Sequence, residues 1–445
     1  MEGKEKKRSR ARGGRAEEYL DALCRQIHWK SYRKAIRDEL KDHIEDASSE
    51  MRKKGLSADQ ALEKALCDLG DPAETGRKLN RIYRPSWNRR LAAAVLGGTA
   101  LFQVLYLSAG VQSGVLDGAG LRMRLLETVI WLLAGVLLSA VVFSRDYSRT
   151  AVVRKWLLIL CLATVLGAAA VRQVFRGQGE SMVTGLMLLL PVFSCFAVGR
   201  QKGEKQPGAL LAAGAAFVPV LAACWLEAYS AAVLLAGTGV VLLAYALHRD
   251  WFELGKKKGY WLLAVLPAAA GGVWIAAQYG WQRFAMGMDG FFIQDYVGQF
   301  RLLGPSGVAG LAEQTADFPL TLCASRYGWI VLLLYGLLLL LLCRGAVKVF
   351  RSQKSFTGRL LTAALLTGWI LRAGLAVLTN LGLPLAPGAV LPFLDGHCAM
   401  AVFYFQMGIL ETVSCFGNYV KGERGDGDKS RLLDIRDGKI IITYR

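Results

Sequence analysis

Ten apolar blocks, each close to the length needed to cross a lipid bilayer, follow one another through the chain after residue 90. A helix of about 20 residues spans the roughly 30 Å hydrocarbon core, where backbone polar groups must be satisfied within the segment itself. The sequence therefore predicts an all-α polytopic membrane protein with about ten transmembrane helices. The expected spans lie near residues 91–111, 125–144, 152–171, 182–199, 208–225, 228–247, 260–278, 327–343, 358–378 and 397–417.

Lysine and arginine are distributed unevenly among the segments that join these blocks. At least three lie in each of the expected loops 145–155, 200–206, 248–259 and 344–357, whereas the intervening loops hold few. Loops rich in positive charge stay on the cytoplasmic side of a membrane. We therefore expect a multi-pass protein of the cell membrane with both termini in the cytoplasm. Residues 279–326 and 379–396 would then lie on the outer face.

The first 85 residues differ from the rest because they are strongly charged and hold no apolar block. Residues 1–15 read as a basic tail, and no cleavable signal peptide is expected. An apolar stripe then recurs every three or four positions, through Ile36, Leu40, Ile44, Ala47 and Met51. This spacing predicts an amphipathic helix that buries one face.

Local signals divide this charged segment into three or four short helices. Ser57 and Gln60 match a capping box, in which two side chains satisfy each other's backbone N–H groups. Gly70 is suited to end that helix, and Asp71-Pro72 to begin the next. The expected organisation is a basic tail, a small N-terminal cytoplasmic helical domain, a membrane domain and a cytoplasmic tail, at residues 1–15, 16–85, 86–418 and 419–445.

Composition narrows the function classes further. The net charge of +19 is compatible with nucleic-acid binding, but the basic residues cluster where membrane topology requires them. We therefore expect membrane lipids, and no nucleic acid, as partners. The nine cysteines form no CxxC pair, so neither a disulfide framework nor a metal site is expected. The absence of P-loop, GxSxG and HExxH patterns argues against the soluble enzyme classes that carry them.

A carboxylate lies in the longest connection between two apolar blocks. Asp317 stands in the stretch LAEQTADFPL, with Glu313 before it and the helix breaker Pro319 after it. Long segments between membrane helices are usually functional, and a carboxylate near the membrane interface is costly to bury without a role. Asp317 is therefore the first candidate for chemistry, and the alternative is a solvated loop acid.

Several stretches resemble motifs of the SEDS (shape, elongation, division and sporulation) family, which includes the FtsW, RodA and SpoVE proteins. LAEQTADF resembles L-P-E-x-H-T-D-F, with Glu313, Asp317 and Phe318 in matching positions. Gly328 matches the glycine of the E-L-G that follows. LGLPLAPGAVLPF, which ends at Phe393, resembles L-G-L-L-P-V-T-G-I-P-L-P-F without a gap. Ten transmembrane helices is also the family's count.

Two further matches lie upstream, and a third covers the N-terminal segment. Trp281-Gln282-Arg283 resembles the Y-Q-R that opens the family's long extracellular loop. Residues 226–243 resemble P-D-L-G-T-A-L-V-L-L, with Glu227 at the position of the family's aspartate. Residues 18–85 resemble a separate module, the helical permease prefix domain, through EYLDALCRQI, IRDELKDHIED and ALCDLGDPAETGRKLNRIYRP.

The resemblance implies a specific function. SEDS proteins are peptidoglycan glycosyltransferases that polymerise lipid II at the outer face of the membrane, in cell division, cell shape or sporulation. Asp317, at the position of the family's essential acid, is implied to be the catalytic general base that takes a proton from the incoming sugar hydroxyl. The resemblance leaves open which process is served, whether a class B penicillin-binding transpeptidase is the partner, and whether a divalent cation is needed.

Other candidate substrate-binding residues carry charge at unusual places. The family's P-F-x-S-Y-G-G-S becomes PFLDGHCA at residues 392–399, which places Asp395 and His397 where small residues are usual. The alternative reading of this pair is a wet helix start. Arg372 lies inside the ninth span, where an arginine costs roughly 2.5–3.5 kcal/mol unless it faces a polar interior. The remaining candidates are Glu313, Arg283 and Glu227, the last of which could pair with Arg372.

Two other functions stay open. The loss of the S-Y-G-G-S, G-R-W and Q-P-S-E motifs favours a catalytically weak relative that serves as a scaffold or regulator of cell-wall synthesis. Alternatively, the chain is a flippase or transporter of a lipid-linked substrate, with Arg372 and Glu227 on the substrate path. Internal inverted repeats would favour transport, and the sequence shows none.

Overall fold

The computed structural model divides into two compact units, residues 1–86 together with 419–445, and residues 87–418. The structure describes residues 2–28, 30–82, 88–114, 116–143, 150–174, 183, 186–198, 218–226, 228–249, 259–261, 264–265, 297–306, 318–353, 355–382, 393–394, 397–416, 433–436 and 439–442.

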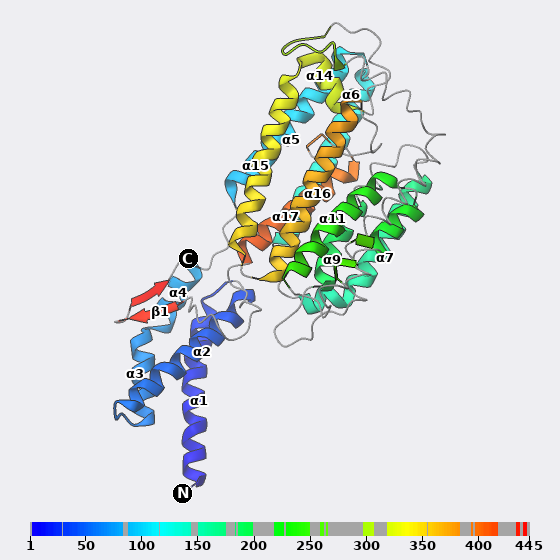
Figure 1. Cartoon of the computed structure of the whole chain (residues 1–445). Coiled ribbons are helices and arrows are strands. Elements are labelled where there is room, and N and C mark those ends of the chain that lie inside the picture. Colours follow the sequence, from blue (N-terminus) through cyan, green and yellow to red (C-terminus); the bar gives the residue numbers. More distant parts are fainter. Residues whose placement is uncertain are drawn as a thin grey trace. The chain divides into compact units, whose positions relative to one another are not determined.

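The smaller unit contains the helices α1 to α4, which are labelled in Figure 1. Their bounds are Glu2–Arg25 for α1, Lys30–Lys53 for α2, Ala58–Leu69 for α3 and Pro72–Ile82 for α4. The stripe predicted on the second helix is confirmed at Ile36, Leu40 and Ile44, which are each at most 3% exposed, whereas Ala47 and Met51 are partly buried. The rest of the aliphatic core of this unit is supplied by the other helices and their connections, through Leu20, Leu23, Ile27, Ala61, Ala65, Leu69 and Leu79.

The helix ends predicted in this unit are also confirmed. The Ser57 hydroxyl accepts a hydrogen bond from the Gln60 N–H, and the Gln60 side chain accepts one from the Ser57 N–H, which completes the capping box. Gly70 ends α3 with a φ of 80°, a backbone conformation that favours glycine. Asp71 Oδ2 accepts from the Glu74 N–H at 2.8 Å and so caps the start of α4.

Two features of this unit add to the sequence-based expectation. The basic segment 1–15 is largely helical, since α1 begins at Glu2. Its Lys, Arg, Glu and Ala residues are good helix formers, which charge alone does not reveal. Near the C-terminus, β1 (Leu433–Arg436) and β2 (Lys439–Ile442) form an antiparallel pair in which Arg436 lies opposite Lys439. The described part of the chain therefore contains a small hairpin besides its helices.

We predict that residues 16–85 fold without the membrane domain. α3 and α4 are capped and the aliphatic core is drawn from all four helices, so the segment should be soluble and helical when expressed alone. Circular dichroism measures this directly. A random-coil spectrum would show that the apolar stripe needs another part of the protein to cover it.

The described part of the larger unit consists of helices and the loops that join them. Its main helices are α5 (Arg89–Gln112), α6 (Gly118–Phe143), α7 (Thr150–Val174), α9 (Leu190–Val198), α11 (Tyr229–His248), α14 (Pro319–Tyr327), α15 (Ile330–Ser352), α16 (Phe356–Asn380) and α17 (His397–Phe416). Among the described residues, five helices (α5, α6, α11, α15 and α16) contain stretches long and apolar enough to cross a membrane, and shorter apolar stretches lie in α7 and α17.

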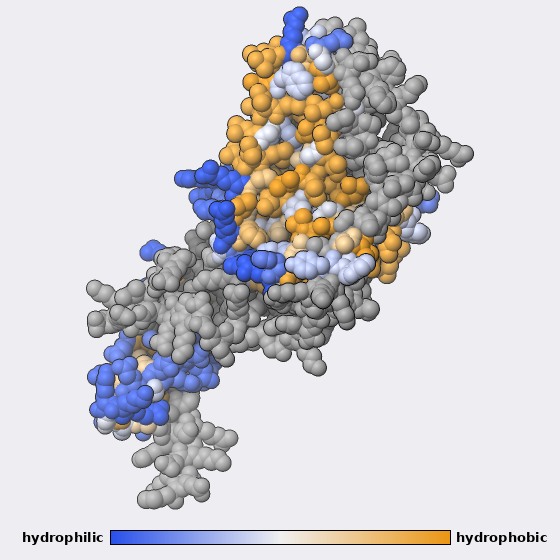
Figure 2. All heavy atoms as spheres, viewed as in Figure 1, coloured by the Kyte–Doolittle hydropathy of each residue, from blue (hydrophilic) through white to orange (hydrophobic). Residues whose placement is uncertain are grey.

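The exposed surface of this unit is apolar over much of the face shown in Figure 2. Such a surface is expected where helices face lipid and not water. The predicted all-α polytopic membrane fold is confirmed. The expected spans 208–225 and 260–278 lie in large part outside the described residues.

Small residues bring the helices of this unit close together. A Cβ added at Gly408 of α17 would lie 2.7 Å from Ser139 Cα of α6, and one added at Gly135 of α6 would lie 2.9 Å from Tyr404 Cβ. Membrane helices associate through such contacts because lipid offers no hydrophobic driving force between them. α17, which begins at His397 within the PFLDGHCA segment, is therefore fixed closely against α6.

Candidate functional site

The structure describes the elements that adjoin Asp317. Asp317, Glu313, Arg283, Glu227 and Asp395 themselves lie outside the described residues. His397 is the first residue of α17, and Arg372 lies in α16. Phe318 is described and forms the N-cap of α14, so the residue directly after Asp317 in the chain has a defined position.

The first turn of α14 is capped by a side chain from another helix. Phe318, the N-cap residue, has no side-chain oxygen and makes no capping hydrogen bond. Asn380 at the end of α16 supplies the missing acceptor, because its Oδ1 accepts from the Leu320 N–H at 3.0 Å and from the Thr321 N–H at 3.1 Å. Pro319 at the first helical position has no N–H to satisfy. The breaker beside Asp317 is thus the first residue of a helix.

This contact between α14 and α16 is buried. Leu320, Thr321 and Asn380 are 1%, 2% and 4% exposed. The Thr321 hydroxyl donates to the Asn380 carbonyl oxygen at 2.5 Å, and Asn380 Nδ2 donates to the Ala376 carbonyl oxygen at 2.8 Å. A buried N–H group without an acceptor costs about 1–3 kcal/mol, so the Asn380 side chain contributes strongly to holding the start of α14.

Gly328 ends α14 and allows a loop to approach it closely. Its φ of 89° favours glycine, and its N–H donates to the Ala324 carbonyl oxygen at 2.8 Å. A Cβ at this position would lie 2.7 Å from Arg301 O and 2.6 Å from Leu302 O. The same two carbonyl oxygens accept from the N–H groups of residues 329 and 330, at 3.0 and 3.3 Å. The positive φ and the close approach of the loop therefore explain why a glycine stands at the position that matches the E-L-G motif.

We predict that Gly328→Ala lowers the thermal stability of the purified membrane protein. Alanine must keep the positive φ of this position, and its methyl group must displace loop 300–306. We expect this to lower the free energy of unfolding by about 1–3 kcal/mol. Gly336→Ala is the matched control, because a Cβ at this position of α15 meets no atom within 4 Å. Equal melting temperatures for the two variants would contradict this account of Gly328.

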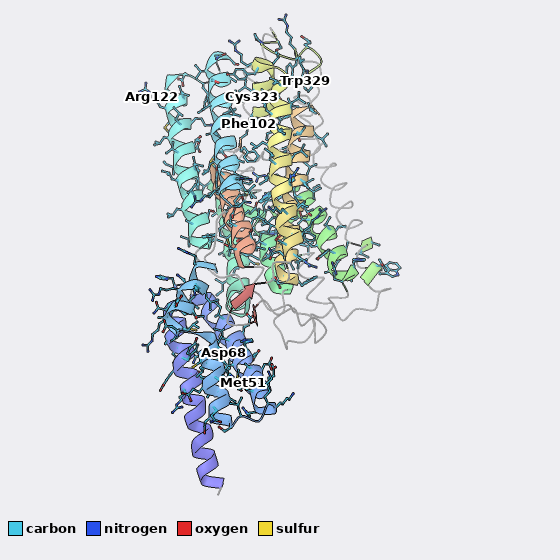
Figure 3. All side chains as sticks on the ribbon, turned by 90° about the vertical axis from the view of Figure 1, so that its left-hand side faces the viewer. Met51, Asp68, Phe102, Arg122, Cys323 and Trp329 are labelled. Atoms are coloured by element: carbon cyan, nitrogen blue, oxygen red, sulfur yellow. The ribbon has the colours of Figure 1, made fainter. Side chains whose placement is uncertain are left out.

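α14 is also bound to α5 along its side. The hydroxyls of Ser108 and Tyr327 lie 2.5 Å apart, and Arg326 Nε donates to Gln112 Oε1. Figure 3 shows Cys323 and Trp329 at the same end of the unit as Arg122, near the start of α6. α14 is thus held at both ends and on one side, at the end of the unit where α5 ends and α6 begins.

The matched L-P-F segment carries the one non-glycine residue with a positive φ among the described residues. Phe393 has a φ of 75° and is 2% exposed. Its carbonyl oxygen accepts from Gln103 Nε2 of α5 at 3.2 Å. Its ring packs edge to face against Phe403 and Tyr335, with ring centres 5.3 and 6.3 Å away. Such strain persists only where the surroundings enforce it, and it clusters at functional sites.

Arg372 lies in the interior of the unit and not at a membrane surface. It is 0% exposed, and Tyr335 on α15 is also buried in this interior. Tyr335 in turn packs against Phe393 and against Phe102 of α5. The role of Arg372 as a substrate-binding residue stays a prediction. Its proposed pairing with Glu227 concerns a residue outside the described part of the chain.

Two residues that position the site were not identified from the sequence. Asn380 and Gln103 are lone amides at the end of an apolar block and within one. A polar side chain in a membrane helix is costly and often functional. An amide among apolar residues was therefore the sequence signal that could have identified these two positions. In the described ranges, no group of three or more His, Cys, Asp or Glu is placed to hold a metal ion.

No protein-family model matches the chain, and neither does any curated protein. Solved structures do match. A structure reported for a peptidoglycan synthase complex that coordinates polymerization and crosslinking aligns with 15% identity and a TM-score of 0.54, over 75% of this chain and 98% of that one. A mutant of the rod shape determining protein RodA from Thermus thermophilus aligns with 15% identity and a TM-score of 0.50, over the same shares.

At this identity, the likeness concerns the fold. It covers nearly the whole length of both solved chains. The helical membrane architecture predicted from the apolar blocks and the architecture found by structural alignment therefore agree. The chain is an all-α polytopic membrane protein with the SEDS-like fold of RodA.

Proposed function

We propose that this protein is a peptidoglycan glycosyltransferase that polymerises lipid II at the outer face of the cell membrane, with Asp317 as its general base. The observation that carries the proposal is the position of Phe318. A buried cap from Asn380 fixes the start of α14 directly after the one acid that matches the family's essential aspartate, in a chain with a RodA-like fold.

The chemistry needs one ionised carboxylate. The acceptor hydroxyl loses its proton to Asp317 as its oxygen attacks the anomeric carbon of the donor sugar. The bond from that carbon to the phosphate oxygen breaks, and polyprenyl diphosphate leaves with the bonding electron pair. Asp317 directly precedes the N-cap of α14 in sequence, and the positive end of a helix dipole favours the ionised form of nearby acids. An ionised carboxylate is the form that a general base requires.

Arg372, Arg283, Glu313 and Glu227 are proposed to contact the substrate, with Asp395 and His397 in place of the family's small residues. The reason to propose Arg372 is its charge within an apolar span, because a guanidinium is well suited to recognise phosphate oxygens. A class B penicillin-binding transpeptidase is proposed as partner, since the structure with the higher TM-score belongs to a complex that coordinates polymerization and crosslinking.

A scaffold without catalytic activity is the second candidate. It is favoured by the sequence PFLDGHCA at residues 392–399, which replaces the small hydroxyl and glycine residues of the family motif. In this case the SEDS-like fold would position partners of cell-wall synthesis, and the permease-prefix-like segment 16–85 would dock cytoplasmic proteins.

The proposed topology makes a separate prediction. Both termini should be cytoplasmic and residues 279–326 outside, because the basic loops alternate along the chain. A single cysteine introduced at Gly298, which is exposed, should react with a membrane-impermeant maleimide added from outside. Labelling of a cysteine within residues 200–206 from the outside would refute this topology.

The proposed function is tested by incubating the purified protein, reconstituted in lipid vesicles, with labelled lipid II. Glycan strands longer than the substrate should appear on a gel, and their amount should increase with time. If no strands form, with or without a penicillin-binding transpeptidase present, the scaffold is the better description.

A further inference from the structure

Loop 300–306 presents two leucines to the outside of the membrane unit. Leu302 and Leu303 are 66% and 64% exposed, and Arg301 before them is also exposed. Three consecutive exposed residues of this kind are unusual in a loop that is otherwise fixed by hydrogen bonds. Loop residues in water are usually polar, so this apolar pair needs a covering surface.

The backbone of this loop is held firmly against α14 and the start of α15. The Gly304 N–H donates to the Tyr327 carbonyl oxygen at 3.1 Å, and the Ser306 N–H donates to the Ser325 carbonyl oxygen at 2.9 Å. The Ile330 N–H donates to the Leu302 carbonyl oxygen at 3.3 Å. These bonds fix the direction in which the loop presents its side chains.

A small apolar cluster around Phe300 and Trp329 packs beside the loop. Phe300 is 9% exposed and packs on Trp329, with ring centres 6.1 Å apart, and the Trp329 indole N–H donates to the Phe300 carbonyl oxygen at 3.2 Å. Val297, Ala324 and Leu332 complete the cluster. The other bulky apolar side chains of this region thus pack against one another in the cluster, whereas Leu302 and Leu303 are not part of it.

The position of the loop along α15 determines what covers the leucines. The membrane-length apolar stretch of this helix begins at Ile330, whose N–H is bonded to the loop. Along the same helix, Leu333, Leu337 and Leu340 are 63%, 54% and 69% exposed and recur at the spacing of one face. In a membrane protein this face contacts lipid. The loop therefore lies at the end of α15 where this helix reaches the membrane interface.

We propose that Arg301, Leu302 and Leu303 form a membrane anchor that inserts into the lipid headgroup region at this end of the protein. The leucines extend the lipid-facing surface of α15 into the interface, and the arginine fits the phosphates of the headgroups. Because the loop is bonded to α14, the anchor fixes the depth of α14 relative to the membrane surface.

The test uses the full chain in vesicles of phosphatidylcholine and phosphatidylglycerol. An environment-sensitive fluorescent amino acid is incorporated at position 303, and in separate preparations at positions 117 and 340. Asp117 is an exposed polar residue in the turn between α5 and α6, and Leu340 lies in the middle of the lipid-facing surface of α15. Quenching is measured with nitroxide lipids labelled near the headgroup or deep in the acyl chain, and with aqueous iodide.

The anchor predicts that the probe at position 303 emits at shorter wavelength than that at 117 and is quenched most by the shallow nitroxide lipid. The probe at 340 should be quenched most by the deep nitroxide, and that at 117 by iodide. If the probes at 303 and 117 are quenched equally by iodide and neither by lipid nitroxides, the anchor is refuted and a protein surface must cover the leucines. The measurement does not require the protein to be an active polymerase.

Discussion

Asp317→Asn is expected to lower the rate of glycan polymerisation by about 10²–10⁴-fold, which corresponds to about 3–5 kcal/mol of activation free energy. Asparagine has nearly the same shape as aspartate but cannot accept a proton from the sugar hydroxyl. Folding should be unaffected, because the described hydrogen bonds at the start of α14 are made by Asn380, Leu320 and Thr321.

The matched control for this variant is Glu313→Gln, which removes a second acid from the same stretch and should have a milder effect. Both variants are compared with the parent in a rate assay on labelled lipid II, after their melting temperatures are shown to agree. If the parent polymerises lipid II and Asp317→Asn retains its rate, Asp317 is a loop acid and the mechanism proposed here is wrong.

Asn380→Leu is expected to have the second-largest effect. It removes the acceptor of two buried N–H groups at a cost of about 1–3 kcal/mol for each, and so releases the start of α14. If Asn380 positions Asp317, kcat should fall much more than KM rises. Asn380→Asp keeps the acceptor oxygen for both N–H groups but loses the amide that donates to the Ala376 carbonyl oxygen, so it should retain more of the rate than Asn380→Leu and less than the parent.

Two comparisons separate positioning from a general loss of stability. Thr362→Val removes another buried hydrogen bond of α16, from the Thr362 hydroxyl to the Gly358 carbonyl oxygen, without touching α14, and should leave the rate nearly unchanged. Asn380→Leu combined with Asp317→Asn should be little slower than Asp317→Asn alone, because positioning has no value once the base is gone. If the rate losses of the two single variants multiply in the double variant, Asn380 does not act by positioning Asp317.

Features that depend on neighbouring residues could be predicted from the sequence. The apolar blocks predicted the membrane helices, and the three- to four-residue spacing of Ile36, Leu40 and Ile44 predicted the buried face of α2. Ser57 and Gln60 predicted a helix start. These signals are local because a helix is defined by contacts between residues three or four positions apart.

Features that depend on distant residues could not be predicted in this way. The cap of α14 joins Asn380 to Thr321, which are 59 residues apart in the chain, and nothing in the sequence near Phe318 indicates it. The contact between Gln103 and Phe393 joins residues 290 positions apart. By contrast, the hairpin near the C-terminus was missed although its signal is local. Asp-Gly between two apolar runs is typical of a two-residue hairpin turn.

Formation of a single glycosidic bond tests the central claim most directly. The purified protein is mixed with lipid II in vesicles, and the products of early time points are analysed by mass spectrometry. The account predicts a product in which two disaccharide units share one polyprenyl diphosphate, with one free polyprenyl diphosphate released for each bond formed, and neither product with Asp317→Asn. Free polyprenyl diphosphate without the doubled product, or equal amounts of the doubled product from parent and variant, would contradict the proposal that Asp317 catalyses polymerisation.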